Sequence, residues 1–285
     1  MNLDLIRKDF PILETQVNGH QIVYFDNGAT TQRPLPVVNA VVDYVTHQNG
    51  NPHRGAHIFA ISASEAYDTS KEVVRDFIHA RSEKEIIYTR NTTESLNLVS
   101  RSYGETHLKK GDHILITIAE HHSNLVTWQR AAEKTGAVLD YIYIDKETGH
   151  FPEEELKKID DPRVKILAFA QVSNVLGVEF DPKPLIKRAH AHGAVVVLDG
   201  AQSTPHKQID VQDLDCDFFA FSGHKMCSMG GIGVLYAKEE LLDEMEPFLM
   251  GGDMIETVEE QTTTFAELPA KFEAGTQYVE GAVGL

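Results

Sequence analysis

The sequence contains only two cysteines, Cys216 and Cys227, in 285 residues. Two cysteines are too few for a disulfide framework, and their spacing matches no zinc-binding pattern. This scarcity excludes the class of small secreted proteins that depend on disulfides. We therefore expect a reducing compartment, which for a chain without targeting signals is the cytoplasm.

Long apolar runs and targeting signals are also missing. No stretch of the chain is apolar for long enough to span a membrane. The first ten residues contain neither an apolar h-region nor a small-residue cleavage site, so no secretory signal is expected. The sequence has no internal repeat, no low-complexity tract and no linker rich in Pro, Gly and Ser. We expect no membrane contact and a core region that forms one domain.

Positive charge is scarce. The chain carries 26 Lys and Arg against 43 Asp and Glu, which gives a formal net charge of -17. A nucleic-acid groove requires clustered Lys and Arg that this chain does not have, so nucleic acids are excluded as partners. A single phosphate group remains possible as a ligand, because local amides and hydroxyls can hold it.

The sequence has enough apolar residues, 42%, to bury a substantial core. Apolar runs alternate with helical patterns, which is typical of a doubly wound α/β fold whose sheet is mostly parallel and has helices on both faces. Seven strands are expected at 85–89, 113–118, 138–144, 165–170, 194–199, 217–222 and 233–237. Helices are expected at 35–47, 62–79, 93–103, 124–135 and 182–192.

Three regions are expected along the chain: an N-terminal arm over 1–20, a large domain over 21–250 and an interface segment over 251–285. The stretch 239–267 is acidic and has Gly251 and Gly252 in its middle. It could be a mobile or partner-facing excursion, and an ordinary solvated loop is an equally good interpretation.

Two predicted strands bring opposite charges to one edge of the sheet. The strand 194–199 ends in Asp199, and His224 and Lys225 follow the strand 217–222. Open α/β sheets bind ligands at this carboxyl edge. A desolvated lysine amine can form a Schiff base with a carbonyl, and a carboxylate can hold a pyridine nitrogen protonated, which together suit pyridoxal 5'-phosphate (PLP). Taken alone, either residue would more often be solvated or cap a turn.

Thr92 and Thr93 follow the strand 85–89 and open a predicted helix, where amides and hydroxyls could hold a phosphate. An ordinary helix cap is the alternative interpretation. Two other motifs are set aside. Adjacent His121 and His122 point apart and have no third ligand at a suitable spacing, so no metal is expected. The glycines at 230, 231 and 233 precede a strand instead of following one, which excludes a dinucleotide loop.

The segments around these residues resemble fold-type I PLP enzymes of the aminotransferase class V family, and most of all the cysteine desulfurases of the SufS/CsdA group. Leu-Asp-Gly-Ala-Gln-Ser begins at Leu198, and Phe-Ser-Gly-His-Lys-Met begins at Phe221. Further matches follow in order at 24–30, 51–57, 90–97, 120–124, 173–177 and 272–276, so the resemblance covers nearly the whole chain. One departure is the stretch 228–231, Ser-Met-Gly-Gly, where the family usually has Gly-Pro-Thr-Gly, and it leaves the geometry of that loop open.

The resemblance implies a role for each site residue. Lys225 would form the Schiff base, Asp199 would face the ring nitrogen, and His121 would stack on the ring and relay a proton. Asn174 and Gln202 would bind the phenolate oxygen of the cofactor and the carboxylate of the substrate. The remaining implied contacts are the phosphate ligands Thr93, Ser222 and His224, the substrate-entrance residues His53 and Arg54, and Thr276, which would reach the phosphate of a second subunit in a homodimer.

The activity that the resemblance implies is conversion of L-cysteine, or L-selenocysteine, to alanine, with sulfur passed to an acceptor of the SufU/SufE type for iron-sulfur cluster assembly. This reaction needs a nucleophilic thiolate. In the family that cysteine and a substrate-binding arginine lie in a C-terminal small domain, which we expect to be absent here, and neither Cys216 nor Cys227 is expected to replace it. The alternatives are a selenocysteine lyase, a kynureninase-like enzyme, or a cofactor-binding remnant with an interaction role.

Overall fold

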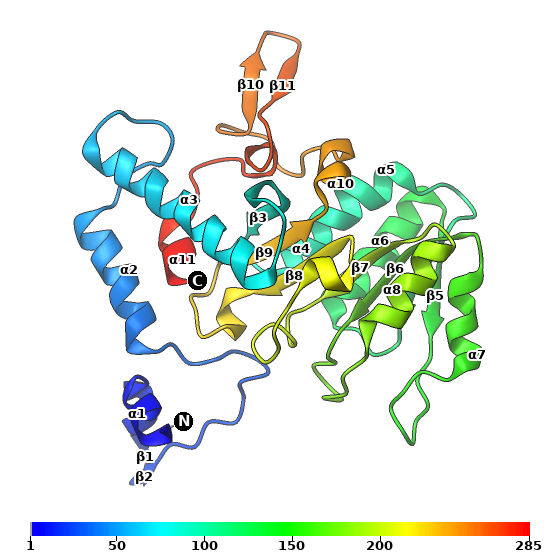
Figure 1. Cartoon of the computed structure of the whole chain (residues 1–285), viewed down its shortest axis with the longest axis horizontal. Helices are drawn as coiled ribbons and strands as arrows, with labels where there is room; N and C mark the ends of the chain where they lie inside the picture. The colour runs from blue at the N-terminus through cyan, green and yellow to red at the C-terminus, as the bar shows by residue number, and fades with distance from the viewer. Residues whose placement is uncertain (1) are drawn as a thin grey trace.

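The computed structural model describes residues 2–285. Figure 1 shows a central sheet with helices on both sides, α2 and α3 beside it, and a hairpin that stands away from it. The strands are β1 (Gln16–Val17), β2 (His20–Gln21), β3 (Ile86–Thr89), β4 (His113–Thr117), β5 (Val138–Ile142), β6 (Val164–Ala170), β7 (Val195–Asp199), β8 (Phe218–Ser222), β9 (Gly233–Ala237), β10 (Ile255–Val258) and β11 (Thr263–Phe265).

The helices are named in the same way. They are α1 (Leu3–Lys8), α2 (Leu35–His47), α3 (Ile58–Ile78), α4 (Thr92–Leu98), α5 (Glu105–His107), α6 (Val126–Thr135), α7 (Glu153–Leu156), α8 (Pro182–Ala191), α9 (Val211–Leu214), α10 (Glu239–Glu244) and α11 (Val279–Gly284). A π-helix, Val99–Gly104, continues α4. Within residues 2–285, no helix combines the length and the apolar composition needed to cross a membrane.

The central sheet has seven strands in the order β3-β9-β8-β7-β6-β4-β5. The strands β4 to β8 pair in parallel, and β9 runs antiparallel to both of its neighbours. This arrangement confirms the mostly parallel sheet predicted from the sequence. In the register, Ala170 on β6 pairs with Asp199 on β7, and Asp199 pairs with Ala220 on β8. The carboxyl ends of these three strands therefore lie side by side.

Side chains of the sheet alternate between two apolar clusters, one on each face. Leu167 and Phe169 pack in the cluster that includes residues of α3 and α8. Ile166 and Ala168 pack in the other cluster, together with Trp128 of α6 and residues of α4. Strands buried on both faces read as continuous apolar runs, which is why the sequence predicted them. The helices on both faces confirm the predicted fold class.

Two helices differ from the sequence-based prediction. The helix predicted at 62–79 begins at Ile58, because the side chain of His57 accepts a hydrogen bond from the Ala60 amide and caps it. The helix predicted at 93–103 is divided into α4 and the π-helix that follows. The predicted strand ends differ by two residues or fewer from the observed ones.

The acidic stretch 239–267 is more regular than the solvated-loop interpretation implies. It contains α10 and the antiparallel hairpin β10–β11, which stands away from the sheet in Figure 1. An exposed hairpin agrees with both the partner-facing and the solvated interpretation, so both stay predictions. All four residues of β10 are exposed.

Candidate active site

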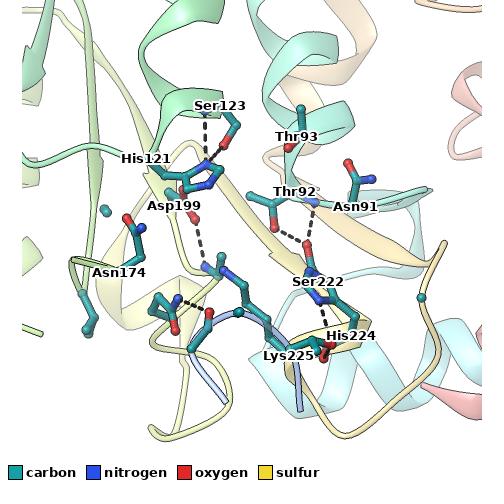
Figure 2. Close-up of a pocket in the computed structure, with 18 of the residues that line it drawn as sticks. Asn91, Thr92, Thr93, His121, Ser123, Asn174, Asp199, Ser222, His224 and Lys225 are labelled. Atoms are coloured by element: carbon teal, nitrogen blue, oxygen red, sulfur yellow. Dashed lines mark hydrogen bonds between the residues drawn. The ribbon is translucent and has the colours of Figure 1, made fainter. Parts of the chain in front are cut away.

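A cavity of about 890 Å³ opens at the carboxyl ends of β6, β7 and β8. It gathers polar side chains that are distant in the sequence, as Figure 2 shows. Nine of the predicted site residues line it: Thr92, Thr93, His121, Asn174, Asp199, Gln202, Ser222, His224 and Lys225. The structure thus brings most of the predicted site together.

The charged centre of the cavity is formed by Asp199 and Lys225. Asp199 is only 4% exposed, and its Oδ1 accepts a hydrogen bond of 2.9 Å from the Ala201 amide. Burial raises the pKa of Asp199, against the opposing effects of the Ala201 amide and of the nearby charges of Lys225 and His121. Within residues 2–285 no donor reaches its second oxygen, Oδ2. That oxygen is available to a cationic N–H group, which would keep the carboxylate ionised.

Lys225 follows β8 in the short 3-10 helix Gly223–Lys225. Burial lowers the pKa of its amine, although the charge of Asp199 acts in the opposite direction. A lowered pKa increases the fraction of free amine, which is the form that attacks a carbonyl. These properties suit Schiff-base formation, and the roles of Lys225 and Asp199 stay predictions.

His121 lies close to Asp199 at the rim of the cavity (Figure 2). Its Nδ1 accepts a hydrogen bond of 3.2 Å from the Ser123 amide and lies 2.7 Å from the Ser123 hydroxyl. An acceptor at Nδ1 assigns the proton of the neutral ring to Nε2. Burial is the main cause that lowers the pKa of His121. The ring is thus a fixed, neutral imidazole with one N–H to offer.

A cluster of hydroxyls lies at the other end of the cavity, where α4 begins. Asn91 caps this helix by accepting a hydrogen bond of 3.0 Å from the Glu94 amide, so Thr92 is not needed as the cap. Instead, the Thr92 amide donates to Ser222 Oγ over 2.8 Å, and the two hydroxyls lie 2.7 Å apart. Thr93 faces the same cavity. The capping alternative is therefore wrong for both threonines.

The segment before α2 holds the loop that carries Lys225. The carbonyl of His224 accepts hydrogen bonds from the Thr31 amide at 2.9 Å and from the hydroxyls of Thr30 and Thr31 at 3.0 Å. The His224 ring bonds back to the Thr30 hydroxyl at 3.2 Å. Burial, followed by the charges of Lys225 and Arg33, lowers the pKa of His224. Its ring is therefore neutral near pH 7.

The two amide side chains also lie in the cavity. Gln202 donates from Nε2 to the Gly28 carbonyl over 2.8 Å, which ties the segment after β7 to the segment before α2. Asn174 lies beyond the end of β6, on the opposite side of Asp199 from the hydroxyls (Figure 2). That Asn174 and Gln202 bind the phenolate oxygen of the cofactor and the carboxylate of the substrate remains a prediction.

Three predicted residues lie outside this cavity. Thr276 lines a neighbouring cavity of about 430 Å³. His53 and Arg54 line another, of about 530 Å³, where His53 bonds Asp68 at 3.1 Å and Arg54 pairs with Asp253. The structure of one chain therefore does not bring His53, Arg54 or Thr276 to Lys225.

Glu120 is a half-buried residue beside His121 for which no role was predicted from the sequence. Its carboxylate accepts hydrogen bonds from the Thr117 hydroxyl, from the Asn124 side chain at 2.6 Å and from the Ala170 amide at 3.1 Å. Burial raises the pKa of Glu120 to about 8, and the charge of Asp199 adds to this effect. Glu120 thus joins the ends of β4 and β6 immediately before His121. The sequence did hold one signal for a role of Glu120: it precedes His121 within the segment 120–124, which matches the family.

Neither cysteine lines the main cavity. Cys216 is fully buried, and burial raises the pKa of its thiol, so it is unsuited to attack as a thiolate. Cys227 is half-buried and lines a separate cavity beside the N-terminal arm.

Fold and site together define an α/β domain with a lysine and a buried carboxylate at the carboxyl edge of a mostly parallel sheet. The family model described as aminotransferase class-V matches residues 23–285. The chain therefore belongs to the aminotransferase class-V family, as the sequence motifs predicted.

Individual relatives are close. The chain is 49% identical over 285 residues to a probable cysteine desulfurase of Halalkalibacterium halodurans, covering 100% of this chain and 70% of that protein. The crystal structure of the cysteine desulfurase CsdA from Escherichia coli matches with a TM-score of 0.90 and 40% identity, over 100% of this chain and 70% of the other. The apo structure of a cysteine desulfurase from Thermococcus onnurineus NA1 matches with a TM-score of 0.91 and 42% identity, over 99% of this chain and 68% of the other. These matches confirm the resemblance to cysteine desulfurases.

Proposed function

We propose that the chain is a PLP-dependent cysteine desulfurase, which acts on L-cysteine and releases L-alanine. The observation that carries the proposal is the placement of Lys225 and Asp199 in one cavity, with a cluster of hydroxyls at its far end. The names of the relatives supply the substrate class. Lys225 and Asp199 do not decide between amino-acid substrates, so the preference for L-cysteine over L-selenocysteine is part of the proposal.

The donors in the cavity fit PLP. Asp199 Oδ2 is free to accept a ring N–H, and burial favours a neutral carboxyl there unless such a cation binds. Thr92, Thr93 and Ser222 offer hydroxyls to a phosphate without requiring a net positive protein. When bound, PLP supplies an electron sink that allows bonds at the amino-acid Cα and Cβ to be broken.

The residues of the chain would then orient the substrate and move protons. Lys225, whose amine pKa is lowered, would hold the cofactor and then carry a proton to and from the substrate Cα. His121 would offer its Nε2 proton from a ring that Ser123 fixes. Since neither Cys216 nor Cys227 is expected to attack, the thiolate of an added or partner thiol would attack the sulfur of L-cysteine. An S–S bond would form, the cysteine C–S bond would break, and its electron pair and the thiol proton of the substrate would go to Cβ of the product alanine.

The proposed partners follow from the same resemblance. We infer a homodimer, a sulfur acceptor of the SufU/SufE type and a role in iron-sulfur cluster assembly. The position of Thr276 outside the Lys225 cavity supports a second copy, because it leaves this residue free to serve another subunit. Apolar side chains at the start of α3 are exposed, 68% for Ile58 and 50% for Phe59, and a partner would cover them. We assign the segment 251–285 to such an interface.

The test combines a spectrum with an activity measurement. The purified chain with PLP, L-cysteine and an added thiol, which supplies the attacking thiolate and reduces the persulfide, should release alanine and sulfide faster than free PLP does under the same conditions. Lys225→Ala should abolish both this activity and the visible absorption of lysine-linked PLP. Lys187→Ala, which changes an exposed lysine on α8, is the matched control and should retain both. Absorption that persists in Lys225→Ala would contradict the assignment of the lysine.

A further inference from the structure

Arg33 lines the main cavity, and the site described above gives it no function. It lies between the N-terminal arm and α2 and is half-buried. Its Nε donates to the Ser228 carbonyl over 3.0 Å, and its Nη1 donates to the Thr31 carbonyl over 3.1 Å. Two backbone carbonyls therefore fix the guanidinium in one orientation.

The third nitrogen of this guanidinium is free. Within residues 2–285 no protein acceptor reaches Nη2, and no carboxylate lies within ion-pair distance of Arg33. This is notable in a chain of net charge -17. Arg90, another arginine of the same cavity, bonds Glu94 over 3.1 Å. A partly desolvated charge that is held rigid but unpaired costs free energy unless an anion binds it.

The surroundings of Arg33 indicate which end of a ligand it would meet. The charge of Arg33 contributes to the lowered pKa of His224, so the two groups are close enough to interact. The Nη2 atom of Arg33 lies beside Gly230. It is 4.0 Å from the position that a Cβ atom of that residue would occupy, which is a van der Waals contact. Ser222, the last residue of β8, and His224, in the 3-10 helix that follows it, lie at the hydroxyl end of the cavity. Asp199 would face the ring of the cofactor, not its phosphate. The charges near Asp199 are those of Lys225 and His121.

We propose that Arg33 is a cofactor-specificity residue that supplies a fixed positive charge to the phosphate of PLP. This inference rests on the proposed function, because it requires PLP in the cavity. The neutral donors Thr92, Ser222 and His224 can bond phosphate oxygens but cannot balance a dianion, whereas a rigid guanidinium can. Arg33 would thereby make the chain prefer PLP to pyridoxal, which has the same ring and aldehyde but no phosphate.

The experiment measures binding of PLP and of pyridoxal by absorbance titration of the cofactor-free chain. The variants are Arg33→Met, which keeps the length but removes the charge, and Arg33→Lys, which keeps the charge. Arg130→Met is the matched control, since Arg130 is exposed on α6. We expect Arg33→Met to weaken PLP binding by about 10-fold or more, the usual effect of losing a charged hydrogen bond. Pyridoxal binding should change less than about 2-fold, and Arg33→Lys should recover part of the PLP affinity.

Other outcomes separate the alternatives. Equal loss of PLP and pyridoxal binding in Arg33→Met would mean that Arg33 only holds the loop, and it would overturn the inference. Unchanged PLP binding with a weaker spectral response to L-cysteine would assign Arg33 to the substrate carboxylate, which also overturns it. Wild-type chain that binds no PLP would refute the proposed function itself. Wild-type chain that binds PLP no better than Arg33→Met does would refute only the role of Arg33.

Discussion

Glu120 offers a quantitative test of how the site is built, through the substitution Glu120→Gln. The carboxylate accepts three hydrogen bonds, one of them from Asn124 Nδ2 at 2.6 Å. Glutamine has the same shape, but its NH₂ group would face this donor. Asn124 cannot simply turn over, because its Oδ1 accepts the Trp128 indole N–H at 2.9 Å. The substitution should therefore cost about one buried hydrogen bond, or about 1–2 kcal/mol.

The effect should also depend on pH. The pKa of Glu120 rises from 4.5 to about 8 in the fold, so the folded state binds a proton that the unfolded state releases between these values. Stability from this group is then fully present below pH 4.5 and is lost as pH rises through 8. At ~1.4 kcal/mol per unit, the full shift would correspond to roughly 5 kcal/mol. The three donors favour the ionised carboxylate and are already included in this net rise, so we expect a change on the order of 5 kcal/mol.

The assay is urea unfolding of the cofactor-free chain at a series of pH values from 5 to 9. The wild-type free energy of unfolding should fall across this range relative to that of Glu120→Gln, which cannot titrate. Glu133→Gln, an exposed change on α6, is the control and should follow the wild type. Parallel curves for wild type and Glu120→Gln would refute the reasoning, because Glu120 would then already be ionised throughout.

Two further charged pairs, both outside the main cavity, can be tested by substitution. Lys71 and Glu273 form an ion pair of 2.6 Å in which each residue is less than 9% exposed. Lys71→Met should lower the free energy of unfolding by about 3–5 kcal/mol, and Lys71→Met combined with Glu273→Leu should recover part of it in urea titrations. His190 bonds Asp217 over 2.8 Å, which raises the pKa of its imidazole. The excess stability of wild type over His190→Gln should thus be fully present below about pH 6.5 and lost as pH rises through the raised value, as parallel urea series would detect.

The sequence predicted the sheet and its charged centre because both depend on local patterns. Each strand buried on two faces is a short apolar run, so its position is readable from the sequence. Asp199 and Lys225 follow two such runs, and neighbouring parallel strands place their ends together. That Asp199 and Lys225 share a cavity could therefore be predicted without knowing how the loops fold.

The features that the sequence did not predict depend on contacts between distant segments. The Nε of Arg33 bonds the carbonyl of Ser228, 195 positions away. Such bonds to backbone carbonyls leave no pattern in the sequence. Glu120 was overlooked for a related reason, because its raised pKa results from burial between strands that only the fold brings together. The positions of His53 and Thr276 are likewise set by the packing of loops.

An acidic chain can bind an anionic cofactor because charge acts locally. Carboxylates spread over the surface are screened beyond about 8 Å at physiological ionic strength. The cavity is lined by Arg33, Arg90 and Lys225. Arg90 pairs with Glu94, so once Lys225 is linked to the cofactor the guanidinium of Arg33 is the cation left for a phosphate. The net charge of -17 therefore affects how fast PLP arrives more than how tightly it is held. For that reason, a change at Arg33 should alter affinity, whereas removing an exposed acidic side chain should not.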